Sequence, residues 1–149
     1  MPIDPSFIGR SYPPTRSYEV GREKIREFAL ALGDDNPAYT DPGAARALGY
    51  PDVIAPPTFP AVLALPALDQ VTADPELGLD YERVVHGDQR FTYIRPIRAG
   101  DVLQVTVTVE NIRSAAGNDL ISTRGDVTTL DGEHVCSSYG TIVARGGGE

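Results

Sequence analysis

The chain has 149 residues, a formal net charge of −8 and an isoelectric point near 4.7. This length suits one domain with a single hydrophobic core, which buries roughly 70% of the surface of the unfolded chain. The acidic balance argues against a nucleic-acid or anionic-membrane surface, because such surfaces need clustered cations and the 13 basic residues are scattered.

Cys136 is the only cysteine, so it cannot form an internal disulfide. We expect it to be a small buried side chain in a reducing compartment, with the cytoplasm as the default. The N-terminus has no basic segment followed by an apolar one, and nowhere do about 18 apolar residues run together. We therefore expect a chain that neither spans a membrane nor is exported.

The first predicted helix covers residues 21–32. Its apolar residues recur at spacings that form one stripe: Ile25, Phe28, Ala29 and Leu32. Gly33 ends this helix, because glycine tolerates the left-handed conformation that closes a helix. The run Asp-Asp-Asn-Pro at 34–37 then predicts a loop, and residues 41–48 predict a short second helix capped by Asp41.

Residues 58–70 predict a different kind of helix, because apolar side chains cover every side of it. Such a helix must be buried all round. Its length of roughly 20 Å, at about 1.5 Å per residue, suits the axis of a small domain. Pro66 should bend it, since an interior proline removes a hydrogen bond and crowds the preceding turn.

After Tyr81 the hydrophobic period changes to two, which predicts strands. Including a weaker one before the first helix, the predicted strands are 17–20, 84–94, 101–112, 120–129 and 134–144. The turn signals between the later strands are short, at 116–119 and 131–132. Consecutive strands should therefore be antiparallel neighbours.

These elements predict an α+β chain with the hot-dog fold, in which a long curved antiparallel sheet wraps around the apolar helix at 58–70. The sheet has one apolar face to cover, and the chain offers one fully apolar helix to cover it. A single domain should span residues 1–145, followed by a disordered tail at 146–149. Because such a sheet keeps exposed edges, we also expect a dimer with a second copy or a homologue.

The motifs of the chain resemble the MaoC-like hot-dog proteins, the family of (R)-hydroxyacyl dehydratases and (R)-specific enoyl-CoA hydratases. Gly33-Asp-Asp-Asn-Pro37 is similar to the hydratase motif of that family, and Val53-Ile-Ala-Pro-Pro-Thr58 to the approach to its central helix. Residues 85–91 and 95–101 resemble its strand and its Gly-Asp turn. The resemblance covers nearly the whole chain.

One position departs from the family pattern. In the hydratase motif a catalytic histidine follows two residues after the proline, and here that position is Tyr39. The chain therefore looks most like the degenerate dehydratase domains that pair with a catalytic hot dog, as in the HadA and HadC type subunits of mycolic-acid dehydratases.

The missing histidine matters for the chemistry. Dehydration of a 3-hydroxyacyl thioester needs a base for the C2 proton, an acid for the leaving hydroxyl and donors aimed at the thioester oxygen. Imidazole, with a reference pKa of about 6.5, suits the base role, whereas a phenol with a pKa of about 10 stays protonated. Tyr39 can donate a hydrogen bond but is a poor base. Asp34 could still orient water, and Asn36 could position a carbonyl group.

The resemblance thus implies a set of candidate site residues. Those with catalytic roles are Asp34 and Asn36, as a degenerate pair, and His86 as an alternative base; those that bind substrate are Tyr39, Thr58, Phe59 and Val62. Residues 33–37 are also explained as a helix stop followed by an Asx turn, and a lone histidine at the start of a strand is more often structural. Three arginines are ordinarily exposed strand charges, but they could meet the phosphates of coenzyme A or of phosphopantetheine: Arg90, Arg95 and Arg98.

The favoured function is a hot-dog subunit of a (3R)-hydroxyacyl-thioester dehydratase or enoyl hydratase in fatty-acid or related acyl metabolism. The chain would be inactive alone and would line the acyl channel beside a MaoC-like catalytic partner, with an acyl-CoA or acyl-carrier-protein substrate. One alternative is a self-sufficient homodimer, either a dehydratase that uses Asp34 with His86 or a thioesterase that uses Asp34 alone. Another is a non-enzymatic acyl-thioester binder.

We expect neither a metal nor another cofactor. Two separated histidines and one cysteine do not make a metal-ligand set, and no phosphate-cradling glycine loop is visible. The acyl chain length, the choice between coenzyme A and a carrier protein, and the choice between a homodimer and a heterodimer are left open by the sequence.

Overall fold

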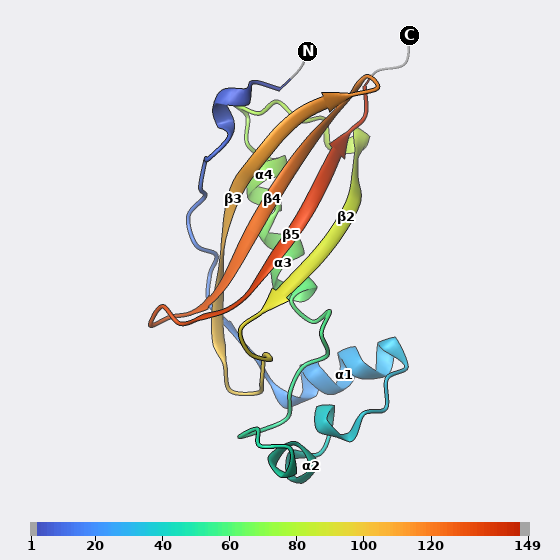
Figure 1. Cartoon of the computed structure of the whole chain (residues 1–149), viewed down its shortest axis with the longest axis vertical. Coiled ribbons are helices and arrows are strands. Elements are labelled where there is room, and N and C mark those ends of the chain that lie inside the picture. Colours follow the sequence, from blue (N-terminus) through green and yellow to red (C-terminus); the bar gives the residue numbers. More distant parts are fainter. Residues whose placement is uncertain (1–2, 147–149) are drawn as a thin grey trace.

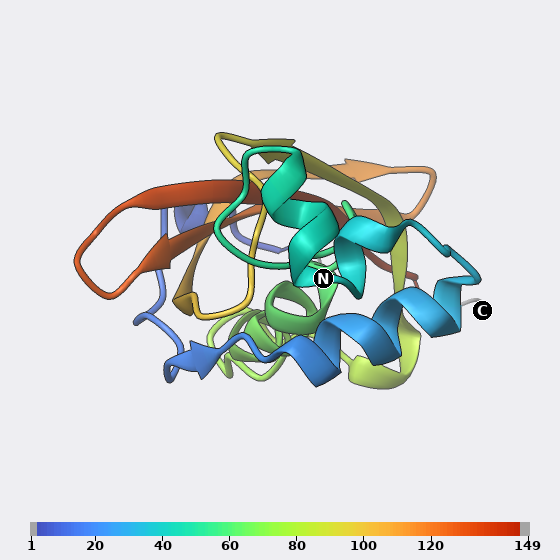
Figure 2. The same cartoon turned by 90° about the horizontal axis from the view of Figure 1, so that it is seen from below.

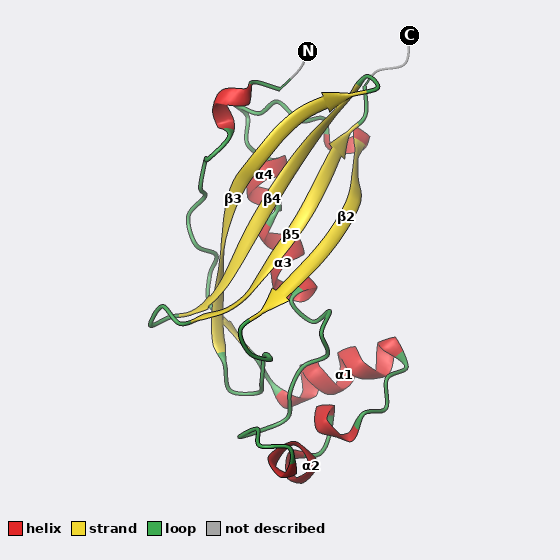
Figure 3. Cartoon of the chain, viewed as in Figure 1, coloured by secondary structure: helices red, strands yellow, loops and turns green. Residues whose placement is uncertain are grey.

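The computed structural model describes residues 3–146, which form a five-stranded antiparallel sheet curled around a central helical segment (Figure 1). The strand order is β1-β3-β4-β5-β2. A separate helical layer lies beyond one end of the sheet (Figure 1) and faces the viewer when the molecule is seen from below (Figure 2). The elements, distinguished in Figure 3, are η1 (Pro5–Phe7), β1 (Tyr18–Glu19), α1 (Arg22–Leu32), η2 (Pro37–Tyr39), α2 (Pro42–Ala47), α3 (Ala61–Ala67), α4 (Asp69–Thr72), η3 (Tyr81–Arg83), β2 (Val84–Tyr93), β3 (Val102–Ala115), β4 (Asn118–Thr129) and β5 (His134–Ala144).

The predicted hot-dog fold is confirmed, and the long strands follow the period-two segments. The strand expected at 134–144 is β5 with unchanged bounds, and the one expected at 101–112 extends to Ala115 as β3. Buried residues on β3 alternate with partly exposed ones and face the central helix: Leu103, Val105, Val107 and Val109. Burying one such side chain contributes about 1.5–3 kcal/mol, so each of these four adds to the hydrophobic stabilisation of the fold.

The central helix is shorter and more interrupted than the prediction of one helix at 58–70. The helical segment begins as α3, only after Pro60, and it is interrupted at Leu68 before α4. Prolines explain both changes. The helical conformation is disfavoured for a residue that precedes a proline, so the helix begins only after Pro60. Pro66 removes a hydrogen bond inside α3 just before the interruption.

The expectation that this helix is buried on all sides is also wrong for a single chain. Leu63, Ala64 and Ala67 are buried, whereas Pro66 is exposed and Leu65 is 41% exposed. The reason is geometric, because the sheet of one chain curls around only part of the helix. The remaining apolar side lies open.

The edge of the sheet at β3 is covered by the N-terminal segment. The backbone N–H groups of three residues in this segment donate to carbonyls of β3 at 2.8–2.9 Å: Gly9 to Val109, Tyr12 to Val107 and Thr15 to Val105. β1 then continues the cover, with Tyr18 opposite Leu103. The backbone groups of this edge are therefore paired within the chain.

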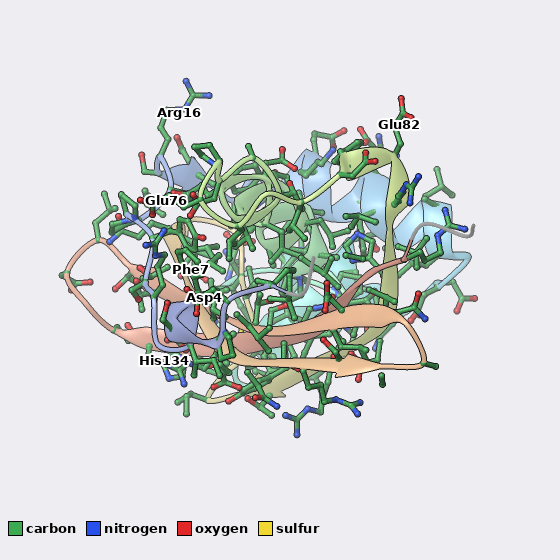
Figure 4. All side chains as sticks on the ribbon, turned by 90° about the horizontal axis from the view of Figure 1, so that it is seen from above. Asp4, Phe7, Arg16, Glu76, Glu82 and His134 are labelled. Atoms are coloured by element: carbon green, nitrogen blue, oxygen red, sulfur yellow. The ribbon has the colours of Figure 1, made fainter. Side chains whose placement is uncertain are left out.

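Side chains hold the N-terminal segment in place. Arg10 lies 4.2 Å from the centre of the Phe7 ring and pairs with Asp74 and Glu76, while the Tyr12 hydroxyl donates to Asp74 at 2.8 Å. Seen from above, Phe7 and Glu76 lie on the same side of the molecule (Figure 4). These contacts join the segment to the loop that follows α4.

The opposite edge, β2, is open. Among the described residues β2 pairs with β5 alone, and eight of its ten residues are exposed. A bulge at Gly87 shifts the register between His86 and Asp88. The free backbone groups of β2 therefore offer a template for another strand.

Two further expectations concern the C-terminal tail and the membrane. The tail expected at 146–149 falls, apart from Gly146, outside the described residues. Within the described residues, no helix is long and apolar enough to cross a membrane.

Candidate functional site

The residues of the loop after α1 explain its conformation. Gly33 has a φ of +70°, which suits glycine, and its N–H group bonds back to the end of the helix. The Asp34 carboxylate accepts a hydrogen bond from the Asn36 N–H at 3.1 Å, and the Asn36 side-chain oxygen accepts one from the Ala38 N–H at 3.0 Å. These two local bonds turn the chain into η2, so both predicted catalytic side chains also have a structural task.

Tyr39 ends η2 and carries its side chain into the molecule, where only 7% of the residue is exposed. Burial raises the pKa of the Tyr39 phenol, and the negative charge of nearby Asp34 raises it further. A hydrogen bond with the neighbouring Asn36 side chain lowers this pKa, but it is the smallest of the three effects. The structure thus brings Asp34, Asn36 and Tyr39 together, around a hydroxyl that stays protonated at neutral pH.

Tyr39 lines an apolar crevice of about 260 Å³ between the η2 region and the end of β2. The lining residues are Tyr39, Ile54, Ala55, Pro57, Tyr93, Ile94, Arg95 and Pro96. Sequence reasoning did not single out Tyr93. Its hydroxyl donates to the Pro57 carbonyl, and Tyr39 lies near enough to raise the pKa of the Tyr93 phenol. Burial raises the pKa of Tyr93 as well, so both phenols in the crevice are hydrogen-bond donors at neutral pH.

A buried ion pair holds one wall of the crevice. The Arg95 guanidinium donates two bonds to the Asp101 carboxylate, each 2.9 Å long, and a third to Glu133 at 2.6 Å. Asp101 also accepts the Arg98 N–H, which closes a turn in which Gly100 has a φ of +94°. Hydrogen bonding to Asp101 raises the pKa of Arg95. Arg95 is therefore engaged within the chain and is not a free phosphate ligand.

Three residues predicted to bind substrate lie outside the crevice lining. Phe59 is fully buried and packs edge-to-face on Phe28, with ring centres 5.4 Å apart. Thr58 is exposed in the turn before α3, and Val62 is partly buried on the helix. Phe59 instead has a positioning role, because its contact with Phe28 fixes α1 and the following loop against the central helix.

His86 is remote from Asp34 within one chain. It is the third residue of β2 and lines a separate hollow of about 200 Å³ with Leu65 and Tyr81, among others. β2 runs from there toward the end of the sheet that faces α1 (Figure 1). Tyr93, at that end, is seven residues farther along, roughly 23 Å at about 3.3 Å per residue.

The space between the central helix and the middle of the sheet is almost filled. The cavity there is about 10 Å³, and it is lined by Ala64 and Leu68 of the helical segment and by Gln89 and Ser138 of the sheet, among others. Such a volume holds at most one water molecule. The acyl channel expected along the helix is therefore not open at this position of the single chain.

The remaining reactive side chains do not join the crevice. Cys136 is fully buried, and burial raises the pKa of its thiol to about 12. His134 contacts the Ser137 hydroxyl at 2.8 Å, and this hydroxyl donates to Asp126 at 2.9 Å. Ser137 bridges the two groups, which is not the order of a nucleophilic triad, where the histidine stands between the other two. Within residues 3–146, no three His, Cys, Asp or Glu side chains are grouped so that they could hold a metal ion.

Comparison with known proteins decides the family. The model of the FAS1-like dehydratase domain region matches residues 6–138 of the chain. The chain belongs to the FAS1-like dehydratase domain family. A relative named "UPF0336 protein" from Streptomyces avermitilis is 63% identical to it over 145 residues, which are 97% of each chain.

Solved structures share the fold of this chain. A chain of the C-terminally truncated HadBC (3R-hydroxyacyl-ACP dehydratase) complex from Mycobacterium tuberculosis is 34% identical, with a TM-score of 0.82, over 92% of this chain and 96% of that one. A MaoC-like dehydratase is 35% identical, with a TM-score of 0.86, over 95% of this chain and 43% of its own length. A chain of the ChsH1–ChsH2 complex, also from Mycobacterium tuberculosis, shares the fold at 23% identity and a TM-score of 0.68, over 91% of this chain and 86% of that one.

Proposed function

We propose that this chain is a subunit of a hot-dog enzyme that dehydrates (3R)-hydroxyacyl thioesters or hydrates the corresponding enoyl thioesters. It forms part of the acyl site and does not supply the base. The membership of a dehydratase domain family and the likeness to the HadBC complex support the reaction class. The proposed reaction would belong to fatty-acid or related acyl metabolism.

The observation that carries the proposal is the buried phenol at position 39. Near neutral pH its proton is held, so it cannot remove a proton from C2 of the thioester. The other phenol of the crevice, Tyr93, is also protonated, and its O–H already donates to the Pro57 carbonyl. His86, which has an imidazole, belongs to a different hollow of the chain. The crevice can therefore hold an oxygen atom of a thioester but has no imidazole beside it in one chain.

The partner in this proposal is a second hot-dog protein with an intact pair of aspartate and histidine. Both HadBC and ChsH1–ChsH2 are complexes of two named components, which supports a partner of this kind. The exposed face of the central helix and the open edge of β2 suit a protein with the same curved sheet. The substrate would be an acyl thioester of coenzyme A or of a carrier protein.

The test is hydration of crotonyl-CoA by the purified chain, followed by addition of a MaoC-like hot-dog protein that carries the intact pair of aspartate and histidine. We expect little turnover by the chain alone and clear turnover by the mixture. Strong turnover by the chain alone would overturn the non-catalytic role. A partner that is equally active with and without this chain would contradict the role as a subunit.

A further inference from the structure

The middle of the inner face of the sheet differs from the rest of that face. On β3 the inward residues between positions 103 and 109 all carry branched apolar side chains. On β4 and β5 the inward positions nearest the middle are small instead: Gly125, Ser138 and Gly140. The residue of the helix that lines the central cavity with them, Ala64, is small too. The inner face therefore has a depression at its centre.

One side chain fills this depression. Gln89 reaches it from β2, and its side-chain N–H donates to the Ser138 hydroxyl at 2.5 Å. A methyl group placed on Gly140 would lie 3.0 Å from the Gln89 side-chain oxygen, so the amide also lies against the backbone of β5. The cavity that is left beside it has only about 10 Å³. The Gln89 amide therefore occupies the space that the small residues leave.

We propose that Gln89 limits the length of the acyl chain that this subunit accepts. This inference rests on the proposed function and adds a specificity-determining residue to it. The amide acts as a polar stop between the central helix and the sheet. A short acyl chain ends before the stop, whereas a longer one has to displace it. The substrate class is therefore short-chain acyl thioesters.

The first argument is the position of the stop relative to the crevice. Side chains alternate along a strand, so Tyr93, Phe91 and Gln89 follow one another on the inner face of β2. Tyr93 lines the crevice and Gln89 lines the central cavity, four residues away, which is roughly 13 Å at about 3.3 Å per residue. The crevice itself, at about 260 Å³, is near the lower limit of about 300 Å³ for small-molecule sites. An acyl chain that begins in the crevice meets the stop only when it is long.

The second argument is polarity. Ser138 is 5% exposed, and its hydroxyl accepts the hydrogen bond from the Gln89 amide. A methylene chain in place of the amide would remove this bond from a buried hydroxyl. Such a loss is unfavourable, because a buried polar group without a partner is costly. The pair therefore opposes an apolar chain by its chemistry as well as by its volume.

The third argument is the space beyond the stop. Leu68 lines both the central cavity and the hollow of about 200 Å³ that contains His86. Leu65 and Ile142 give this hollow apolar walls. Gln89 as a whole is exposed, since β2 is the open edge, so the space beside it is reached from that edge. Without the amide, the depression and the hollow together offer apolar surface to the far end of a longer chain.

Binding of acyl-CoA esters to the purified chain tests the stop. Isothermal titration calorimetry with butyryl-CoA, octanoyl-CoA and dodecanoyl-CoA gives a dissociation constant for each length. We expect the wild type to bind dodecanoyl-CoA at most about threefold more tightly than butyryl-CoA, because the additional methylene groups stay in water. Gln89→Ala should raise this preference about tenfold or more, because each methylene group that leaves water tightens binding about fourfold.

Two further variants make the result specific to the depression. Gln104→Ala is the matched control, because Gln104 lies between two inward residues of β3 and so points to the outer face. Its preference for dodecanoyl-CoA should equal that of the wild type. Adding Gly140→Ala to Gln89→Ala places a methyl group in the vacated space, where the nearest remaining atom, the Asp88 carbonyl oxygen, is 3.6 Å away. This double variant should return toward the preference of the wild type.

The outcomes separate this proposal from the proposed function. Equal preferences in the wild type and in Gln89→Ala, with butyryl-CoA still bound, would overturn the stop and leave the dehydratase proposal untouched. A gain in Gln89→Ala that Gly140→Ala does not reduce would also overturn it, because the opened space would then lie elsewhere. If no variant bound any of the esters, the acyl site itself would be contradicted, and the proposed function with it.

Discussion

The two edges of the sheet are both built from long strands, but one edge is covered and the other is open. β3 is covered over most of its length by residues 9–19 of the same chain, and the Arg10 and Tyr12 side chains hold this cover in place. β2 is left open, is exposed on both faces and ends at the crevice. The comparison teaches that the chain covers one edge by itself and leaves the backbone groups of the other unpaired within the described residues. Mutations at the two edges should therefore differ in what they change.

The largest effect on stability is expected beside the covered edge, at Asp101. The Val20 N–H donates to the Asp101 carbonyl, and the Asp101 carboxylate holds the largely buried Arg95. Asp101→Ala leaves this guanidinium with only part of its partners, so we expect a loss of about 3 kcal/mol in the free energy of unfolding in urea. Asp88→Ala on the open edge is the control, with an expected change within about 0.5 kcal/mol. Equal losses in the two variants would remove the distinction between the edges.

The second prediction concerns the crevice at the end of the open edge. Tyr39→His introduces an imidazole beside Asp34, and positioned acid–base groups contribute about a hundredfold or more to a rate. We expect crotonyl-CoA hydration by Tyr39→His to exceed that by Tyr39→Phe by about this factor. The Phe variant controls for the loss of the hydroxyl. If the two variants were equally inactive, the missing imidazole would not be the reason for low activity of the single chain.

A smaller effect is expected from loosening the cover itself. Tyr12→Phe removes the hydrogen bond to Asp74, which should cost about 1–2 kcal/mol in urea unfolding. The same bond is the main cause that lowers the pKa of Asp74. Because a lowered carboxylate pKa adds stability above the unfolded value of about 3.9, this contribution is lost as the pH falls through the folded pKa. Acidification should therefore destabilise the wild type more than Tyr12→Phe, and parallel acid limbs would contradict the assignment.

The smallest change in the stability of one chain is expected on the open side. Tyr81→Ser replaces a side chain of a residue that is 73% exposed, so the free energy of unfolding of the monomer should change by no more than about 0.5 kcal/mol. Binding to the hot-dog partner of the proposed function, measured by sedimentation of the mixture, should weaken. A large loss of monomer stability with unchanged association would place Tyr81 in the core of the chain instead of at its interface.

Much of the fold could be predicted because its signals are local. The period of two predicts β3, β4 and β5 within a few residues, and the stripe that ends at Gly33 predicts α1. The central helix was predicted too long. Its apolar residues favour one continuous buried helix, but Pro60 and Pro66 limit where the helix begins and continues. Hydrophobic periodicity reports which face of an element is buried, but proline decides where the element can begin and continue.

The sequence by itself determined the strand pattern, the loop after α1 and the absence of a histidine two residues after Pro37. Only the tertiary structure decided that Tyr93 lies near Tyr39, that Arg95 is held by Asp101 and that His86 belongs to another hollow. It also decided which edge of the sheet stays open. The physical reason is that the placement of Tyr93 and His86 relative to the loop after α1 joins residues far apart in the chain and depends on the curl and register of the sheet. Arg95 and Asp101 are only six residues apart, but the turn between them decides that their side chains meet.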